Sequence, residues 1–361
     1  MRYPRLIINL NKIRENVRSI VSICSKFGVE VVGVTKVTCG NPVIAKLLVD
    51  SGIKILGDSR LKNIKLMKEA GVESRFMLLR IPMLSEIEEA VQLVDIFLVS
   101  EFKVVEAISR FSKSAGLKKQ VIYMIDIGDL REGVWLEDSL DEIIEASKLE
   151  GIEFVGIGTN LGCYGGVIPT REKMEQLIEI KRFLENNGVK VKIVSAGNTA
   201  ALPLIERNEL PEEINQYRIG EAIMLGTDAT NNRIIDYLNR ETFILEAEIV
   251  EIKVKPSVPL GETGRDSLGR IPKFEDKGKI KRAILAIGEQ DIDSKGIYPL
   301  DEKARILHAS SDHLIVDINE SSIDYKIGDK MSFLLNYSAL LRCMTSDYVE
   351  KVFLKGDDPS G

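Results

Sequence analysis

The sequence predicts an α/β fold, a (β/α)8 TIM barrel, followed by a smaller all-β domain. Short apolar, β-branched runs alternate with amphipathic helix patterns eight times between Val31 and Leu225. Several of these runs are apolar throughout, as expected of parallel strands that helices cover on both faces. After Asp236 the helix periodicity gives way to short alternating runs separated by glycine and proline, which is typical of antiparallel sheet.

The barrel pattern begins with a helix from Leu10 to Phe27, whose apolar residues recur at helical spacing and which stops before Gly28. Eight predicted strands follow, at residues 31–36, 53–56, 75–80, 96–99, 120–127, 154–158, 189–194 and 217–225. The predicted helices after the first seven strands are residues 41–49, 60–69, 85–94, 103–114, 139–149, 170–186 and 200–207. A doubly wound open sheet is the alternative, but it would not usually need all eight units.

The second domain is predicted from five runs at residues 243–254, 281–287, 304–307, 314–318 and 330–335. We therefore expect a barrel over residues 9–233 and a β-domain over residues 234–355, which residues 1–8 could join. The polar, turn-rich residues 356–361 are expected to be a disordered tail.

Composition and charge exclude several classes of function. The 361 residues are 44% hydrophobic and 29% charged, and a net charge of −6 argues against a nucleic-acid or anionic-membrane partner. The N-terminus does not resemble a signal peptide, and no apolar run reaches the ~18 residues of a membrane span, so we expect a cytoplasmic protein. Two histidines and four scattered cysteines without a C-x-x-C pair predict no metal site.

Polar residues that follow the predicted strands would share one mouth of the barrel, because such a barrel places its chemistry at the carboxyl ends of its strands. Lys36 ends the first strand, although a surface lysine closing a strand is an equally simple reading. The other strand ends carry Asp58, Arg80, Arg131, Asn160, the turn Ser195–Thr199, and Arg218 with Gly220 and Glu221. This collection of cations and glycine-containing turns indicates an anionic, phosphorylated ligand.

Two of these strand ends are especially informative. The turn from Ser195 to Thr199 has a glycine and two hydroxyls and opens a helix whose N-terminus would favour a phosphate, although an ordinary helix cap at Asn198 or Thr199 explains it as well. Arg218 lies in an otherwise small or apolar strand and needs a partner, because an unpaired buried charge is costly. That partner is either a carboxylate of the barrel or the ring nitrogen of a cofactor.

Taken in order, these residues resemble the fold-type III pyridoxal-phosphate enzymes, that is, the alanine racemase family and more closely its ornithine/lysine racemase-like branch. The resemblance covers essentially the whole chain and implies pyridoxal 5′-phosphate as the cofactor. It implies that Lys36 forms the Schiff base and that Arg218 faces the pyridine nitrogen. It further implies cofactor contacts from Arg131, Asn160, Ser195, Asn198, Thr199, Gly220, Glu221 and Tyr337.

The chain also departs from the family's pattern. Gly40 stands where alanine racemases carry a tyrosine, Asn160 stands where a histidine is usual, and residues 288–293 lack the tyrosine that supplies the second catalytic base. These changes favour a longer substrate than alanine. Glu289 or Asp291 could meet a distal ammonium or act as the base on the second face, ahead of Tyr337 and Cys343, although residues 288–293 can also be read as a solvated acidic turn.

The resemblance therefore implies a racemase that interconverts the L and D forms of a basic amino acid, ornithine or lysine, by two-base abstraction of the α-proton. Lys36 would act on one face and a group from a β-domain on the other, in a homodimer with shared sites. The alternatives are an aldolase or decarboxylase on the same scaffold, a non-catalytic pyridoxal-phosphate homeostasis protein, and a barrel without a cofactor. A metal-dependent aldolase would want more histidines, and the homeostasis proteins resemble the barrel alone.

Overall fold

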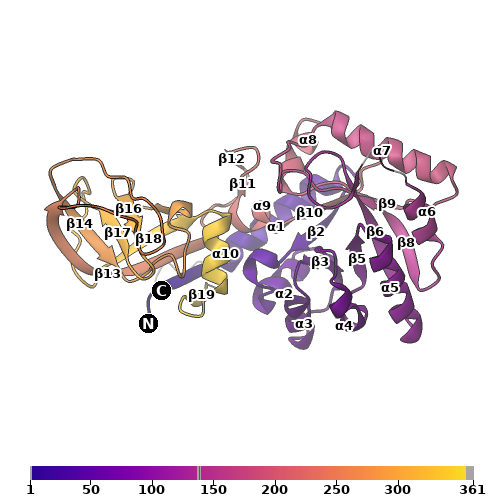
Figure 1. The fold of residues 1–361 in the computed structure, drawn as a ribbon, viewed down its shortest axis with the longest axis horizontal. Coiled ribbons are helices and arrows are strands. Elements are labelled where there is room, and N and C mark those ends of the chain that lie inside the picture. The colour runs from indigo at the N-terminus through magenta and orange to yellow at the C-terminus, as the bar shows by residue number, and fades with distance from the viewer. Residues whose placement is uncertain (1, 136–137, 139, 355–361) are drawn as a thin grey trace. The chain divides into compact units, whose positions relative to one another are not determined.

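The computed structural model describes residues 2–135, 138 and 140–354, and the chain divides into two compact units (Figure 1). The barrel unit is Ile13–Asn239, and the β unit combines Met1–Lys12 with Arg240–Gly361. The expected disordered tail, residues 356–361, lies outside the described residues, as does Ser139, where a helix was expected to begin.

The barrel unit is a closed barrel of eight parallel strands. In chain order these strands are β2 (Glu30–Val34), β3 (Ile55–Asp58), β4 (Arg75–Leu78), β5 (Ile96–Val99), β6 (Lys119–Asp126), β8 (Ile152–Gly158), β9 (Ile193–Ser195) and β10 (Gln216–Ile219). The ring closes because β10 pairs with β2 and β5 pairs with β6, all in parallel register. The short strand β7 (Val134–Trp135) pairs with the end of β6. The predicted (β/α)8 barrel is therefore confirmed.

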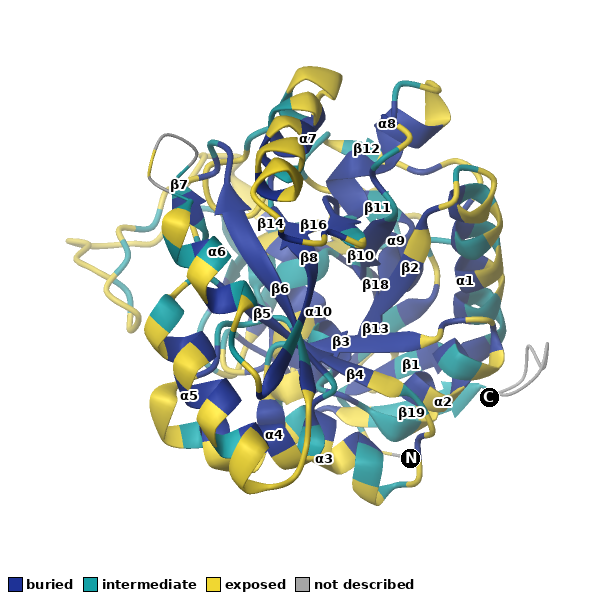
Figure 2. Ribbon diagram, turned by 90° about the vertical axis from the view of Figure 1, so that its right-hand side faces the viewer, coloured by how far each residue is buried: buried dark blue, intermediate teal, exposed yellow. Residues whose placement is uncertain are grey.

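Helices surround these strands, as Figure 2 shows, with their buried residues turned toward the barrel. They are α1 (Leu10–Ser25), α2 (Pro42–Asp50), α3 (Leu61–Glu69), α4 (Ile87–Leu93), α5 (Phe102–Ser114), α6 (Asp141–Ser147), α7 (Arg171–Asn186), α8 (Leu202–Glu206) and α9 (Glu221–Leu225). A cluster of buried side chains from six strands fills the centre: Val32, Ile55, Met77, Ile96, Leu98, Ile122, Met124 and Val155. Because the strand ends rest on this packed core, the loops that follow them have a rigid base.

Three predicted elements differ in extent from those observed. The expected eighth strand, residues 217–225, is the strand β10 followed by the helix α9, and Gly220 with φ −128° and ψ −60° caps that helix. A stretch of mostly apolar residues does not distinguish strand from helix, which is why the sequence pattern merged them. The first strand ends at Val34 rather than Lys36, because residues Lys36–Thr38 form a 3₁₀ turn. The seventh strand is only the three residues of β9.

The β unit is built on one mainly antiparallel sheet. Its strands are β1 (Arg5–Asn9), β13 (Phe243–Pro256), β14 (Lys279–Leu285), β15 (Ile297–Pro299), β16 (Arg305–Ala309), β17 (Leu314–Asp317), β18 (Lys330–Leu335) and β19 (Glu350–Leu354). Strand β1 pairs antiparallel with β13 and parallel with β19. Alternating residues such as Leu245 and Ala247 are buried, as a half-covered sheet requires. The helix α10 (Tyr337–Thr345), which the sequence pattern did not reveal, packs on the same unit.

A two-residue pair of strands, β11 (Thr227–Asp228) and β12 (Arg233–Ile234), completes the barrel unit. Within the part of the chain that the structure describes, no helix is both long and apolar enough to span a bilayer.

Candidate active site

Neighbouring strands bring the predicted cofactor residues of the barrel unit to one end of the barrel. The register pairs Arg218 with Val32 on β2, and Gln216 with Ser195 on β9. The same end receives Asn160, because β8 pairs with β9 and Gly158 lies opposite Ser195. The order β8, β9, β10, β2 thus sets Asn160, Ser195, Arg218 and Lys36, the second residue after β2, around an arc of the barrel mouth.

Arg218 is buried and is held by neutral oxygen atoms. Its Nη1 donates to the carbonyl oxygen of Ser195 at 2.7 Å and to Ser195 Oγ at 2.5 Å. Its Nη2 donates to the carbonyl oxygen of Thr159 and, at 3.2 Å, to Asn160 Oδ1. Within the described residues Arg218 forms no ion pair with a carboxylate, so its charge is oriented without being neutralised. Burial lowers the pKa of Arg218 to about 10, and the nearby Glu132 carboxylate opposes this shift.

Asn160 links this arginine to a second one. Its Nδ2 donates to Glu132 Oε1 at 2.7 Å, while its Oδ1 accepts from Arg218. The Glu132 carboxylate also pairs with both Nε and Nη2 of Arg131. Although burial acts to lower the pKa of Arg131, the hydrogen bonds that Arg131 donates to Glu132 help to raise it. Arg131, Glu132, Asn160 and Arg218 therefore form one continuous chain of hydrogen bonds.

The loop that carries Arg131 folds back tightly on the end of β6. Asp126 Oδ1 accepts from the backbone N–H groups of Gly128 and Leu130. Gly133 has φ +136°, and a Cβ there would come within 2.3 Å of the Asp126 nitrogen, so only glycine fits. The tight turn fixes where Arg131 and Glu132 leave the barrel wall.

The turn from Ser195 to Thr199 supplies the strongest candidate for a phosphate site. The side chains of its last two residues both accept backbone hydrogen bonds. Asn198 Oδ1 accepts from Ala200 N at 2.8 Å, and Thr199 Oγ1 accepts from Ala222 N at 3.1 Å. The second bond ties the end of this turn to the first turn of α9. The expected helix of residues 200–207 is instead a 3₁₀ turn, Thr199–Ala201, followed by the five residues of α8. Asn198 is its N-cap, so the simpler capping interpretation also holds.

Residues at the two helix starts have different roles. Among the described residues, no acceptor satisfies the backbone N–H groups of Asn198 and Thr199, which leaves two donors for an anion. Glu221, in contrast, uses its carboxylate within its own segment, where it accepts from Thr227 Oγ1 at 2.8 Å and Ala229 N at 2.9 Å. Burial raises the pKa of Glu221. At the start of α9, therefore, the backbone N–H groups of Gly220 and Glu221 are suited to binding a phosphate, and the Glu221 side chain is not.

Lys36 is held at the end of β2 by a specific turn. The hydroxyl of the preceding Thr35 donates to the buried Asp58 carboxylate at 2.7 Å, and Asp58 also accepts from Arg60 N and Asn63 Nδ2. Gly40 closes the turn with φ +62°. The side chain of Lys36 is half-buried, next to β10 in the order of strands.

The remaining predicted site residues, Glu289, Asp291 and Tyr337, belong to the β unit. Glu289 accepts from Arg270 Nη1 at 2.9 Å and Ser294 Oγ at 2.5 Å, and lies 3.3 Å from Arg342 Nη1. Two guanidinium groups thus balance its charge. Asp291 is buried and accepts from Ser346 Oγ at 2.6 Å. Tyr337 is the first residue of α10, immediately after the capping residue Asn336.

The turn that carries Glu289 is locked to the β16–β17 hairpin turn. Glu289 N donates to the carbonyl oxygen of Ser310 at 2.8 Å, and Gln290 N donates to that of Ser311 at 3.1 Å. A Cβ on Gly288 would lie 2.2 Å from Ser311 O, so glycine is required at this contact. These two turns of the β unit therefore behave as one rigid edge.

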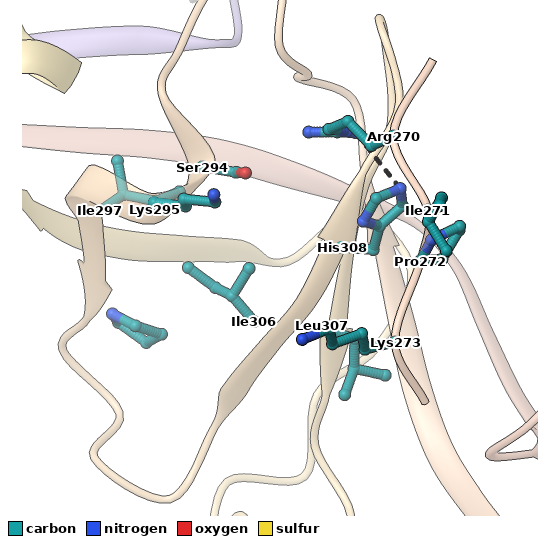
Figure 3. Close-up of a pocket in the computed structure, with 11 residues that line it drawn as sticks. Arg270, Ile271, Pro272, Lys273, Ser294, Lys295, Ile297, Ile306, Leu307 and His308 are labelled. Carbon is teal, nitrogen blue, oxygen red and sulfur yellow. Dashed lines mark hydrogen bonds between the residues drawn. The ribbon is translucent and has the colours of Figure 1, made fainter. Parts of the chain in front are cut away.

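A cavity of about 650 Å³ opens beside this edge (Figure 3). Ile297 and Ile306 contribute apolar surface, and Arg270, Lys295 and His308 contribute nitrogen atoms. Arg270 and His308 point toward one another, with Nη2 and Nε2 3.2 Å apart, and Asp266 binds both. Among the described residues, no group of three or more His, Cys, Asp or Glu side chains could hold a metal ion.

Sequence reasoning missed two residues that organise the mouth. In the sequence, Glu132 is recognisable only as an acidic residue beside Arg131. Asp129 is buried, and its two carboxylate oxygens accept four backbone N–H groups of the loop after β8, those of Gly162, Cys163, Tyr164 and Val167. The signal for Asp129 was an acid in a glycine-flanked loop, which is common at turns and does not reveal a partner more than thirty residues away.

Comparisons with known proteins agree with this geometry. Residues 8–228 match the family model described as alanine racemase, N-terminal domain. A lysine racemase of Thermotoga maritima is 53% identical over 98% of this chain and 99% of its own length. An ornithine racemase of Acetoanaerobium sticklandii is 44% identical over 98% of this chain and 100% of its own length.

Solved structures show the same fold at lower identity. An alanine racemase from Clostridium difficile 630 has a TM-score of 0.73 and 22% identity, covering 98% of this chain and 96% of its own. An alanine racemase from Bartonella henselae, with covalently bound pyridoxal phosphate, has a TM-score of 0.76 and 18% identity, covering 98% of this chain and 100% of its own.

Proposed function

The chain belongs to the alanine racemase family, and from this premise we propose that it is a pyridoxal-phosphate-dependent racemase of a basic amino acid, ornithine or lysine. The observation that carries the proposal is the similarity over essentially the full chain to both a lysine racemase and an ornithine racemase. The match extends through both units, so it includes the β unit as well as the barrel.

The residues present at the barrel mouth fit this cofactor. Lys36 offers the amine that would hold it covalently, and the N–H groups of Asn198 and Thr199, with the start of α9, offer donors for its phosphate. Arg218 offers a buried cation whose neutral partners leave its charge available to the ring nitrogen. When bound, pyridoxal phosphate withdraws electrons from the substrate's α-carbon and so makes its proton removable.

Racemisation then requires proton transfer on both faces of the α-carbon. We assign one face to the amine of Lys36, which would accept the proton in its neutral form. For the other face we keep Asp291 and Glu289 as candidates. We rank Asp291 ahead of Glu289, because the Glu289 carboxylate is already engaged by the guanidinium groups of Arg270 and Arg342.

Because those acids lie in the β unit, we further propose a homodimer in which the β unit of one subunit completes the site of its partner. The cavity of Figure 3 supports this, since exposed apolar residues, Ile271 and Leu307, are among those that line it. The cytoplasmic location expected from the sequence remains a prediction.

The test is exchange of the α-hydrogen in deuterated water, with added pyridoxal phosphate and single-enantiomer amino acids, read beside the appearance of the opposite enantiomer. We expect exchange with inversion for ornithine or lysine and little for alanine. A protein that carries the cofactor but exchanges no amino acid would contradict the proposal and favour a non-catalytic cofactor-binding role.

A further inference from the structure

Glu132 lies between the two arginines of the proposed cofactor site. Its side chain is 17% exposed and pairs with Arg131 through both of its oxygen atoms. It also accepts from Asn160 Nδ2 at 2.7 Å, and it is the carboxylate that acts on the charges of both Arg131 and Arg218. No role has been given to it in the proposed reaction.

Glu132 determines which way the amide group of Asn160 is turned. An amide presents an acceptor oxygen on one side and a donor NH2 on the other. With Nδ2 directed at Glu132, Oδ1 is directed at Arg218, which donates to it at 3.2 Å. Turned over, the amide would present its NH2 to the guanidinium, a contact between two donors. Arg218 is 4% exposed, so water cannot readily replace the lost acceptor.

We propose that Glu132 is a positioning residue, which acts through Asn160 to hold Arg218 in the orientation that receives the cofactor. The inference rests on the proposed function for the identity of that cofactor. Two requirements follow from the geometry. The side chain at position 132 must reach Asn160 and must accept a hydrogen bond, whereas its negative charge is secondary.

Two conservative variants separate reach from charge. Glu132→Gln keeps the length of the side chain and the oxygen that accepts from Asn160 but removes the charge; its NH2 group then faces Arg131, whose side chain is 36% exposed and can bind water instead. Glu132→Asp keeps the charge but withdraws it from Asn160 by one methylene. We expect the Asp variant to weaken binding of pyridoxal phosphate about tenfold, the scale of one charge-assisted hydrogen bond, and the Gln variant to stay within about threefold of the wild type.

The measurement is the dissociation constant of pyridoxal phosphate, obtained by titrating the cofactor-free full-length protein and following cofactor absorbance. The absorption maximum of the bound cofactor should shift in the Asp variant and not in the Gln variant. Glu206 is the matched control, since it pairs with both Nη atoms of Arg233 and is 21% exposed. Glu206→Gln and Glu206→Asp should leave both readouts unchanged.

A second comparison tests whether Glu132 acts through Asn160. In an Asn160→Ala background, Glu132→Asp should cause no further loss of cofactor affinity, because the link is already cut. Multiplied losses in the double variant, or a Gln variant weaker than the Asp variant, would overturn the inference. A wild-type protein that binds pyridoxal phosphate but racemises nothing would refute the proposed function, while the ranking of the variants would still decide the role of Glu132.

Discussion

Replacement of Asp129 by asparagine should loosen the loop after β8 while leaving the barrel folded. Asp129 Oδ1 accepts from the N–H groups of Gly162 and Val167, and Oδ2 accepts from those of Cys163 and Tyr164. Asparagine replaces one of these oxygens with an NH2 group. Two backbone donors then lose their acceptor and face another donor, whichever way the amide is turned.

The size of the effect follows from the two lost hydrogen bonds. A hydrogen bond to a charged group contributes about 1.5–3 kcal/mol, so opening the loop should become easier by about 3–6 kcal/mol. At 1.4 kcal/mol for each factor of ten, the amides of residues 162–167 should exchange with deuterium about two to four orders of magnitude faster. Native-state hydrogen exchange measures this directly, because it reports local opening separately from global unfolding.

Asp126→Asn is the control for this experiment. Asp126 is also buried, but its two backbone donors, Gly128 N and Leu130 N, both use Oδ1. An asparagine can keep that oxygen in place, so exchange in its own turn should change little. Unchanged protection of residues 162–167 in Asp129→Asn, or equal losses of protection in the two variants, would refute the reasoning.

Three further predictions concern the site. Lys36→Ala should abolish turnover and the covalent retention of pyridoxal phosphate, which is measured by absorbance after gel filtration. Full activity in this variant would refute the assignment of Lys36. Asp291→Asn should slow α-hydrogen exchange from one enantiomer more than from the other, and equal slowing would favour a binding role. Burial raises the pKa of Asp58, so ionising it costs the folded state free energy, and stability should fall as pH rises from the unfolded value of about 4 through the folded pKa. In urea titrations, Asp58→Asn should lack that fall, and an identical pH profile in the variant would contradict this account.

Much of the barrel could be predicted from the sequence because each buried parallel strand is a short apolar run with an amphipathic helix behind it. The prediction was wrong where packing rather than periodicity decides the structure. Apart from Arg218 and Glu221, residues 217–225 are small or apolar, and the backbone at Gly220 marks the change from strand to helix. Helix α10 was missed for a related reason, since its amphipathic turns follow β18 directly, with only the cap Asn336 between them.

At the candidate site the sequence could predict residue types at strand ends but not their partners. Arg218 needed a partner on physical grounds, and the sequence allowed either a carboxylate or a cofactor. Its four acceptors are carbonyl, hydroxyl and amide oxygens from Ser195, Thr159 and Asn160, and two of these are backbone atoms that no residue pattern reveals. Glu132 and Asp129 likewise bind residues about thirty positions away.

The pairing of β1 with both β13 and β19 constrains the order in which the chain can fold. Residues 5–9 are made first, yet one neighbour of β1 is the last strand that the structure describes. In the sequence, the barrel unit, Ile13–Asn239, lies between β1 and both strands that pair with it. During synthesis the barrel can therefore close while β1 is still unpaired. A chain shortened before Glu350 would leave one edge of β1 unpaired and exposed to other chains. Strand β1 therefore gains its second neighbour only after residues 350–354 have been made.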